Sequence, residues 1–420
     1  MALCKRRGFV YPTSEIYGGF VSSYDYGPVG AELLRNIRNL WWKYFISDRE
    51  DMVGLDSQII LHPKTWEASG HVANFSDPIV ECKFCHRRFR ADQIDLENFK
   101  CENCGGTEIT EPKNFNLLFE TSIGVVENEK AKAYLRGETA QGIFSNFKNI
   151  VDSNRVSLPF GVGQIGKSFR NEITTGQFIF RTLEFEQAEI EYFFDPAQTD
   201  WQTLMDLWKE SMLNFVTKNL GIKPENLRFR RHTDKERSHY SKDTYDLDYN
   251  FPFGWKELWG IAYRTDYDLK QHQKFSGVDL GYNGILPHVI EPAVGITRLF
   301  FMILVDAYSQ EENRIVLKLD PKVAPYKVAI FPLVHNKPEL VSKAREIYSK
   351  LKQHFMVVWD DRGNIGKRYL AQDEIGTPWC VTVDYQSLED GTVTVRDRDT
   401  TTQERVLIDK LTEYFQNKLQ

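Results

Sequence analysis

The sequence predicts an α+β fold in which an antiparallel sheet flanked by helices is followed by a smaller α/β domain. The first observation is the stretch 161–194, where apolar and charged residues alternate on both sides of a short polar turn. Alternation at period two is typical of strands, so we expect two antiparallel strands joined by a loop. The second observation is a proline-containing linker at 320–325, beyond which strand-like and helix-like segments alternate. That alternation predicts a mixed sheet covered by helices.

The composition is that of an ordinary globular protein of two or three domains. Of the 420 residues, 41% are hydrophobic and 27% are charged. We find neither an apolar run that would span a bilayer nor the apolar region of a secretory signal. The net charge of -6 argues against unspecific nucleic-acid binding but permits a local basic surface for a structured RNA. Six cysteines, four of them in two CxxC pairs, fit metal binding in a reducing cytoplasm better than disulfides.

The N-terminal elements follow from hydrophobic spacing. Residues 8–28 are rich in Gly, Tyr and Ser and predict an irregular loop. Apolar residues then recur at helical spacing from Leu33 to Trp41, which predicts a helix. A strand is expected at 58–61, where it ends at His62-Pro63.

Later segments are predicted in the same way. Residues 200–220 predict a helix, and 222–250 predict a small polar insert with a basic first half. We expect this basic half to be a solvated face, with RNA contact as the alternative. In the C-terminal domain we expect helices near 338–353 and 403–418 between four strands.

A metal site is predicted within residues 82–104. The pattern C-x2-C-x15-C-x2-C places two thiolate pairs at a spacing that can close a tetrahedral zinc site. All four ligand positions would be filled, so the zinc would be structural, and it would stabilise a segment too short and polar for its own core. The predicted ligands are Cys82, Cys85, Cys101 and Cys104.

The strand pair within 161–194 carries an unusual face. At period two Arg170 shares a face with Glu172, and a second set on one face comprises Arg181, Phe185, Gln187 and Glu189. Arginine binds phosphate oxygens bidentately, and carboxylates suit an ammonium group or Mg²⁺. The expected ligand therefore carries phosphates at one end and an amine at the other. A solvated, salt-bridged hairpin is the alternative that the alternation alone allows.

Several motifs resemble those of the class II aminoacyl-tRNA synthetases. Phe169-Arg170-Asn171-Glu172 resembles motif 2, and HVIEPAVGITRLFFMIL at 288–304 resembles motif 3. The wider run GQIGKSFRNEI…FIFRTLEFEQAEIE is similar to glycyl-tRNA synthetases of the homodimeric type. The helix near 33–41 and the strand after it resemble motif 1, which builds the dimer interface in that family. The resemblance covers nearly the full chain.

The resemblance implies an architecture and an activity. It implies a class II catalytic domain over 1–320, containing the zinc-binding insertion 82–104 and the polar insert 222–250, and an anticodon-binding domain over 321–420. The implied enzyme is a cytoplasmic homodimer that ligates glycine to its tRNA through a glycyl-adenylate. ATP with Mg²⁺ is the implied substrate complex, and Zn²⁺ the implied structural metal.

The resemblance also assigns residues to ATP. Arg170 would bind the α-phosphate, Glu172 would accept from the adenine amino group, and Phe185 would stack on the adenine. Arg181 would reach the terminal phosphates, and Arg298, in the first turn of an apolar helix, would bind the γ-phosphate. The implied catalytic residues are Arg170, Glu172 and Arg298. The implied ATP-binding residues are Arg170, Asn171, Glu172, Phe180, Arg181, Phe185, Glu257 (also a magnesium ligand), Leu258, Gly295 and Arg298.

The implied amino-acid site is an acidic cup. Three carboxylates, those of Glu138, Glu189 and Glu291, would surround the ammonium group, and Arg264 would orient the glycine. Lack of room beside the α-carbon would reject alanine, so no editing domain is expected. The implied substrate-binding residues are Arg90, Glu138, Phe185, Gln187, Glu189, Arg264, Glu291 and Ala293.

Two positions depart from the family pattern. Gly137 stands where the family has proline, so Glu138 is expected to be less preorganised. Ala293 stands where the family has serine, which removes a hydroxyl from the glycine site. We expect a weakened contact with glycine and a working site. Two alternatives remain: a synthetase for another amino acid, such as proline or histidine, and a non-catalytic nucleic-acid-binding protein derived from a synthetase.

Overall fold

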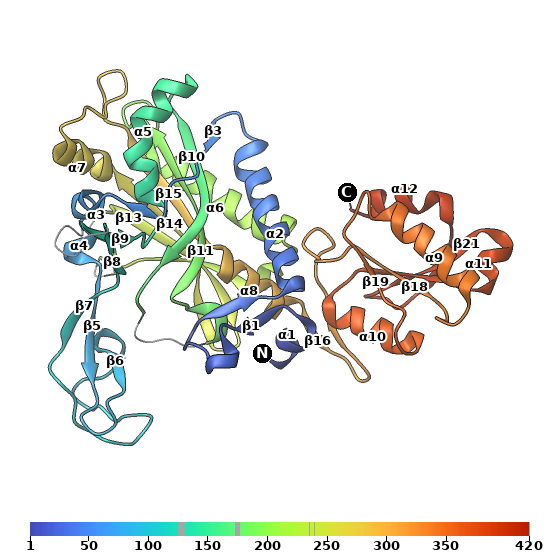
Figure 1. The fold of residues 1–420 in the computed structure, drawn as a ribbon. Coiled ribbons are helices and arrows are strands. Elements are labelled where there is room, and N and C mark those ends of the chain that lie inside the picture. The colour runs from blue at the N-terminus through green and yellow to red at the C-terminus, as the bar shows by residue number, and fades with distance from the viewer. Residues whose placement is uncertain (125–130, 173–176, 235, 239, 420) are drawn as a thin grey trace.

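The computed structural model describes residues 1–420 except 125–130, 173–176, 235, 239 and 420. Figure 1 shows a large N-terminal unit, a smaller C-terminal unit and a slender insertion that projects from the large unit. No helix of the described chain is long and apolar enough to cross a membrane. This arrangement agrees with the predicted α+β fold and its α/β C-terminal domain.

The large unit is built on a seven-stranded sheet. Its strand order is β12-β13-β14-β15-β11-β10-β3, and only the β3–β10 pair is parallel. The strands are β3 (Met52–Gly54), β10 (Phe160–Phe169), β11 (Glu184–Phe194), β12 (Leu227–Arg231), β13 (Asp243–Phe251), β14 (Gly254–Thr265) and β15 (His288–Gly295).

The pair β10–β11 confirms the antiparallel strands predicted within 161–194. Gln164 lies opposite Glu189, and the register continues from Phe160–Phe193 to Phe169–Glu184. The loop residues 173–176, expected to form the turn, lie outside the described residues. Even-numbered residues of β11 such as Ile190 enter the main core, while Glu189 and Phe193 lie on the opposite face of the sheet.

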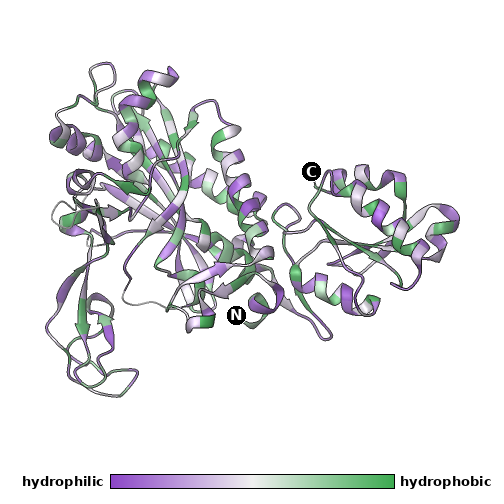
Figure 2. Cartoon of the chain, in the orientation of Figure 1, coloured by the Kyte–Doolittle hydropathy of each residue, from purple (hydrophilic) through white to green (hydrophobic). Residues whose placement is uncertain are grey.

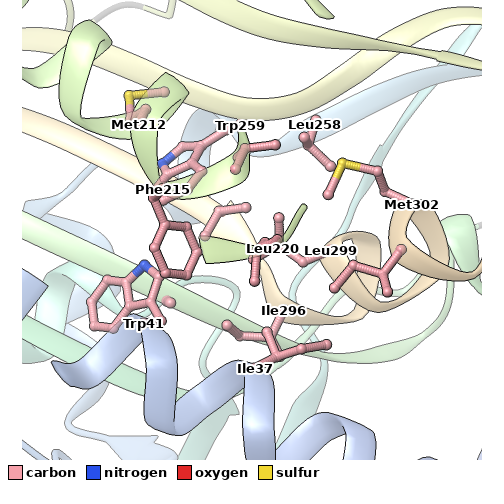
Figure 3. Close-up of a cluster of buried hydrophobic side chains, with 14 of the residues drawn as sticks. Ile37, Trp41, Met212, Phe215, Leu220, Leu258, Trp259, Ile296, Leu299 and Met302 are labelled. Carbon is pink, nitrogen blue, oxygen red and sulfur yellow. The ribbon is translucent and has the colours of Figure 1, made fainter. Parts of the chain in front are cut away.

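Helices cover both faces of this sheet. On one face α2 (Pro28–Trp42), α6 (Trp201–Asn214) and α8 (Ile296–Ala307) pack over the main core. Figure 3 shows Trp41 from α2, Trp259 from β14 and Leu299 from α8 meeting in this core. On the other face α5 (Ala140–Asn154) and α7 (Tyr267–Ser276) close a second, smaller core. The helix predicted near 33–41 is therefore present and is longer than predicted.

Shorter elements surround the two layers. The remaining helices of the large unit are α1 (Ala2–Arg7), α3 (Pro63–Ala68) and α4 (His71–Asn74), and single π-helical turns extend α2 and α6 at Lys43–Ser47 and Phe215–Asn219. The remaining strands are β1 (Val10–Pro12), β2 (Tyr24–Tyr26), β4 (Ile60–Leu61), β8 (Glu120–Ile123), β9 (Ala131–Leu135), β16 (Tyr308–Gln310) and β17 (Ile315–Leu317).

Two sequence predictions for the large unit were wrong. The predicted polar insert 222–250 contributes β12 and β13 to the main sheet, because the alternating run 243–251 buries one of its faces. The strand predicted at 58–61 shrinks to β4 of a separate three-stranded sheet. The strand that follows α2 into the main sheet is β3, which hydrophobic spacing alone did not reveal because it is only three residues long.

The insertion is a small three-stranded sheet with its own core. Its strands are β5 (Ser76–Glu81), β6 (Arg88–Arg90) and β7 (Lys113–Asn116), in the order β6-β5-β7. Residues 82–104, predicted as the insertion, therefore form its outer part, and β5 and β7 carry it back to the large unit. Its buried residues include Phe89 and Phe99, whose rings meet edge to face beside the cysteines.

The C-terminal unit is a five-stranded mixed sheet in the order β19-β18-β20-β21-β22. Its helices alternate apolar and polar residues along the ribbon (Figure 2), as expected for helices that cover a sheet. The strands are β18 (Val328–Pro332), β19 (Val357–Trp359), β20 (Trp379–Val383), β21 (Thr392–Asp397) and β22 (Gln403–Leu407), and the helices are α9 (Pro338–Leu351), α10 (Ile365–Ile375), α11 (Tyr385–Asp390) and α12 (Leu411–Leu419). The helix predicted for 403–418 was wrong at its start, where 403–407 pairs with β21 as β22.

The linker between the units packs on the large unit. Val323 and Ala324 are fully buried in the main core, so this core extends beyond residue 320. Ion pairs join the units directly: Arg7 Nε lies 2.6 Å from Glu374 Oε2, and Arg314 Nη1 lies 2.9 Å from Asp373 Oδ2. Helix α10 of the C-terminal unit is thereby tied to α1 and to the β16–β17 hairpin.

Candidate active site

A cavity opens on the face of the main sheet opposite the α2–α6–α8 core. Strands β11, β13, β14 and β15 form its floor, and the segment after β10 and the start of α8 form its walls. Thirteen residues predicted from the sequence line it: Glu138, Arg170, Glu172, Phe180, Arg181, Phe185, Gln187, Glu189, Glu257, Glu291, Ala293, Gly295 and Arg298.

One end of the cavity is rich in arginine. The Arg170 guanidinium lies 5.2 Å from the ring centres of both Phe75 and Phe185, and its Nε donates to the Gly137 carbonyl over 3.1 Å. Phe185 is half-buried near the start of β11 and lines the cavity, where its ring faces the arginine. Cation–π contacts of this kind fix a guanidinium plane without neutralising its charge. Arg170 is therefore held in place and keeps its positive charge for a ligand.

Two more arginines complete this end. Arg181 and Glu172 both line the cavity and form an ion pair, with 3.7 Å between Nη1 and Oε2. Arg298, in the first turn of α8, lies over the Phe180 ring at 4.7 Å and makes a 3.0 Å ion pair with Glu257. The side chains of Arg181 and Arg298 keep 28% and 22% of their surface exposed, so both remain accessible from the cavity. Three accessible cations in one cavity suit a polyphosphate.

The opposite end is acidic and buried. Glu138, Glu189 and Glu291 line it, and none of their side chains is more than 9% exposed. Glu189 accepts from Gln187 Nε2 at 2.9 Å and from the Thr139 hydroxyl. Burial raises the pKa of Glu189 well above its usual range, and the charge of Glu291 raises it further. Such a site offers carboxylates to a cation in a water-poor setting.

Arg264 lies beneath this acidic end. Its side chain is 1% exposed, donates to Asp268 from two nitrogens over 2.7 and 2.9 Å, and also forms an ion pair with Glu291. Burial raises the pKa of Glu291, and the Arg264 charge partly offsets that effect. The described residues that line the cavity do not include Arg264. The structure therefore places Arg264 behind the carboxylates, where it braces them, and not at the position predicted for direct contact with a ligand.

Three other predicted site residues lie away from the cavity lining. Leu258 is 1% exposed and packs in the main core beside Met302 (Figure 3), because the alternation of β14 turns it away from Glu257. Asn171 donates its backbone N–H to the Leu117 carbonyl. Arg90, on β6 of the insertion, forms ion pairs with Asp77 at 3.0 Å and Asp92 at 2.7 Å.

Sequence reasoning also missed residues that the structure brings to the cavity. His232, Tyr240, Thr244 and Asp246 come from the stretch taken as a polar insert. Asp246 lies 2.8 Å from His232 Nε2, and burial together with the charge of Glu257 raises its pKa to about 6. The alternation in 243–251 was the signal that could have placed this strand in the sheet.

The four predicted zinc ligands meet at the end of the insertion. Their sulfur atoms all lie within 4.8 Å of one another, and the Sγ atoms are 3.6 Å apart in the pairs Cys82–Cys104 and Cys85–Cys101. Zn–S bonds of about 2.3 Å in a tetrahedron put sulfurs roughly 3.8 Å apart, close to this spacing. The donor set and its geometry thus fit a structural Zn²⁺.

Comparisons with known families agree with this geometry. Residues 119–307 match the family model "tRNA synthetase class II core domain (G, H, P, S and T)", and residues 327–418 match "Anticodon binding domain". The first match spans β8 to α8 and so contains all the described residues that line the cavity, and the second covers the C-terminal unit. Fold and site together define a class II aminoacyl-tRNA synthetase.

Curated relatives are more specific. The chain is 51% identical to the glycine–tRNA ligase of Borrelia garinii subsp. bavariensis, over 100% of this chain and 96% of the relative. It is 50% identical to that of Borreliella burgdorferi over 100% and 96%, and 48% identical to that of Caldanaerobacter subterraneus over 100% and 97%. The chain therefore belongs to the glycine–tRNA ligase family.

Proposed function

We propose that this chain joins glycine to ATP, releases pyrophosphate, and passes the glycyl group to the terminal ribose of its tRNA. The observation that carries the proposal is a single cavity with three accessible arginines at one end and three buried carboxylates at the other. The charges of the two substrates complement these two groups of side chains, since ATP brings phosphates for the arginines and glycine brings an ammonium group for the carboxylates. Fitted end to end, they would place the glycine carboxylate beside the α-phosphorus.

The first reaction is an in-line attack by the glycine carboxylate on the α-phosphorus. The nucleophile is already ionised, so the site needs no general base, and catalysis rests on positioning and on stabilising charge. In our proposal Arg170 binds the α-phosphate and the attacking carboxylate. Arg181 and Arg298 bind the outer phosphates, and Arg298 does so near the start of α8, where the helix dipole is positive.

The adenine would lie between these arginines and the sheet. We propose that Glu172 accepts from the adenine amino group and that Phe185 stacks on the ring face. Glu257 and Asp246 offer carboxylate oxygens on neighbouring strands next to this end, which suits Mg²⁺. When bound, Mg²⁺ would neutralise part of the phosphate charge.

At the acidic end Glu138, Glu189 and Glu291 would surround the glycine ammonium. Ala293 lies on β15 opposite Glu189, and we propose that it lines the space around the glycine α-carbon. A substrate with a side chain would then be rejected by contact, which requires no editing step. Two neighbouring side chains would position these carboxylates: Gln187 donates a hydrogen bond to Glu189, and Arg264 forms an ion pair with Glu291.

We propose that Zn²⁺ binds Cys82, Cys85, Cys101 and Cys104 as a structural metal. Chelation should then loosen the insertion while leaving the main sheet folded. Metal analysis of the purified protein, with Cys101→Ser as the matched variant, checks this directly. A protein that carries no zinc and keeps the same protease resistance at the insertion would contradict it.

We further propose that two chains associate beside α2. Four large apolar side chains just before α2 are highly exposed, namely Ile16 at 86%, Tyr17 at 86%, Phe20 at 73% and Val21 at 77%. A patch of this kind on a single chain usually marks an interface. Sedimentation of the wild type and of a Phe20→Ser variant should show a dimer and a weakened dimer, respectively.

The remaining assignments follow from the same reaction. We propose that the catalytic domain comprises the chain up to the linker near 320, that 321–420 binds the tRNA anticodon, and that the enzyme works in the cytoplasm, where ATP and tRNA are found. We propose that Arg90 and Asn171 contact the substrate at the rim of the cavity, although neither is in its lining: Asn171 stands between the lining residues Arg170 and Glu172, and the charge of Glu172 acts on Arg90.

The test is amino-acid-dependent exchange between ATP and pyrophosphate, with glycine, alanine, serine and proline compared. We expect exchange with glycine alone. Exchange with another amino acid would mean that the acidic end is built for a different substrate. Silence with every amino acid, from folded and zinc-loaded protein, would favour the non-catalytic nucleic-acid-binding alternative.

A further inference from the structure

The carboxylate of Glu138 contacts a buried histidine, His71, which the sequence motifs did not indicate. His71 Nε2 lies 3.2 Å from Glu138 Oε2, and the His71 side chain is only 5% exposed. His71 opens α4, the short helix that leads into the insertion, and lies far from 138 in the sequence. We propose that His71 is a positioning residue that fixes the Glu138 carboxylate for the glycine ammonium, an inference that rests on the proposed function.

Hydrogen bonding sets the direction of this contact. A carboxylate only accepts, so Nε2 must carry a proton. His71 Nδ1 lies 2.8 Å from Ser69 Oγ, which also lies 3.3 Å from the Trp66 carbonyl. If Ser69 donates to Nδ1, neutral His71 donates from Nε2, and if Ser69 donates to Trp66, the imidazolium donates from both nitrogens. Both protonation states of His71 place a donor on Glu138.

Aromatic packing fixes the plane of the imidazole ring. Its centre lies 5.3 Å from that of Trp66 and 5.0 Å from that of Phe75, and Trp66 is fully buried. Phe75 also lies 5.2 Å beneath the Arg170 guanidinium. Phe75 therefore contacts both His71 and Arg170, the arginine proposed for the α-phosphate.

The same aromatic ring accounts for the glycine before Glu138. A Cβ atom placed on Gly137 would lie 3.1 Å from the Phe75 ring and 3.2 Å from a Leu118 methyl group. Contacts this short would require Phe75 or Leu118 to shift. Gly137 thus allows Phe75 to approach closely, and Phe75 in turn packs against the His71 ring.

Other neighbours of Glu138 support the same carboxylate. Gln141 Nε2 donates to Oε1 over 3.0 Å, and Arg264 Nη2 lies 3.9 Å from it. Burial opposes ionisation of Glu138, but the charges and hydrogen bonds of His71, Arg264 and Gln141 outweigh it and lower its pKa. The pKa of Glu138 is thus shifted in the opposite direction to that of Glu189.

The experiment is glycine-dependent ATP–pyrophosphate exchange on the full-length, zinc-loaded protein. His71→Phe keeps a ring and removes the donor, and we expect the KM for glycine to rise about 10- to 100-fold, as for loss of a hydrogen bond to a charge. The KM for ATP should stay within about twofold. His71→Gln retains an N–H near the Nε2 position and should recover much of the loss.

Two further variants keep the proposal falsifiable. Ser69→Ala removes the partner of Nδ1 and should raise the KM for glycine about threefold to tenfold, even if His71→Phe fails to fold. His288→Phe is the matched control, because His288 is partly buried and bonded to the Tyr263 hydroxyl at 2.6 Å, outside the cavity lining. It should leave both KM values unchanged.

The outcomes separate the two proposals. If wild-type protein shows no exchange with glycine, the proposed function itself fails. If the wild type is active and His71→Phe and Ser69→Ala both leave the KM for glycine unchanged, only the role of His71 is refuted. A parallel rise of both KM values with no recovery by His71→Gln would mean that His71 is merely structural, and would also refute it.

Discussion

The two ends of the cavity are built in opposite ways. The arginine end consists of side chains that are each held by a few contacts with aromatic rings, a carboxylate or a backbone carbonyl and that stay accessible. The acidic end is a buried network in which Arg264 joins Asp268, Glu291 and Glu138 at 1% exposure. A polyphosphate brings many oxygens and its own cation, so its site can adapt. A substrate with only an ammonium and a carboxylate can be selected only by a rigid site.

Breaking the buried network should have the largest effect. Arg264→Met removes the cation beneath the carboxylates and leaves their charge uncompensated, so we expect the free energy of unfolding to fall by about 3–5 kcal/mol. Urea unfolding of the variant measures this. Arg181→Met is the control from the arginine end, where the side chain is 28% exposed, and it should lose less than about 1 kcal/mol. Equal losses would mean that the two ends do not differ in the way argued here.

Removing an accessible arginine should spare stability and abolish chemistry. Arg170→Ala deletes the proposed ligand of the α-phosphate, and we expect the rate of glycine-dependent exchange to fall by about 10²- to 10³-fold. Its unfolding midpoint should stay close to that of the wild type. Lys167→Ala is a suitable control, since the Lys167 side chain is 40% exposed and pairs with the exposed Glu184 at 2.8 Å. Full activity in Arg170→Ala would contradict the assignment.

The buried carboxylate of Glu191 should make the stability of the protein depend on pH. Glu191 is fully buried, and neither of its oxygens has a hydrogen-bond partner among the described residues. Burial and the charge of Glu291 raise its pKa well above the ordinary value. A raised pKa means that the folded protein keeps a proton that the unfolded chain releases, so Glu191 destabilises the fold increasingly as pH rises above its unfolded pKa.

Glu191→Gln should therefore stabilise the protein at high pH. We expect the variant to match the wild type near pH 4 and to exceed it by about 1–3 kcal/mol at pH 8, the usual cost of an unsatisfied buried group. Denaturant unfolding at both pH values makes the comparison. Glu184→Gln is the control, since Glu184 is exposed at the start of the same strand. A gain that is the same at both pH values would contradict the titration of Glu191.

The smallest expected effect is at Ala293. Ala293→Ser restores the hydroxyl that the family pattern has next to the glycine ammonium, and one such hydrogen bond is worth about 1 kcal/mol, or roughly fivefold in the KM for glycine. Steady-state exchange kinetics measure the change. An unchanged KM would indicate that the network behind Glu291 already compensates for the missing hydroxyl.

Much of the site could be predicted from local sequence. The predictions that did not hold share one cause, which is that local sequence does not show which layer a strand faces. Motif residues on β11 and α8 lie where period-two and helical spacing place them, so Phe185, Gln187, Glu189 and Arg298 all reach the cavity. The side chain of Leu258 does not line the cavity, because the neighbour of a lining residue on a strand faces the other layer. Residues 222–250 were wrongly predicted as an insert outside the sheet. Their many charged residues hid the apolar–polar alternation of strands at the edge of the main sheet. Ion pairs such as Arg228–Asp248 across β12 and β13 explain how so polar a stretch forms strands.

Spacing within short segments of the sequence determined the zinc pattern and the paired strands that indicate the α+β class. The resemblance of several motifs, which lie far apart in the chain, supplied the residue types at both ends of the cavity. The tertiary structure alone decided which of these residues act on a ligand and which support the others. Arg264 lies behind the carboxylates, and His71 reaches Glu138 from a helix that precedes the insertion. Contacts between residues far apart in sequence depend on how layers pack, and no local pattern records that packing.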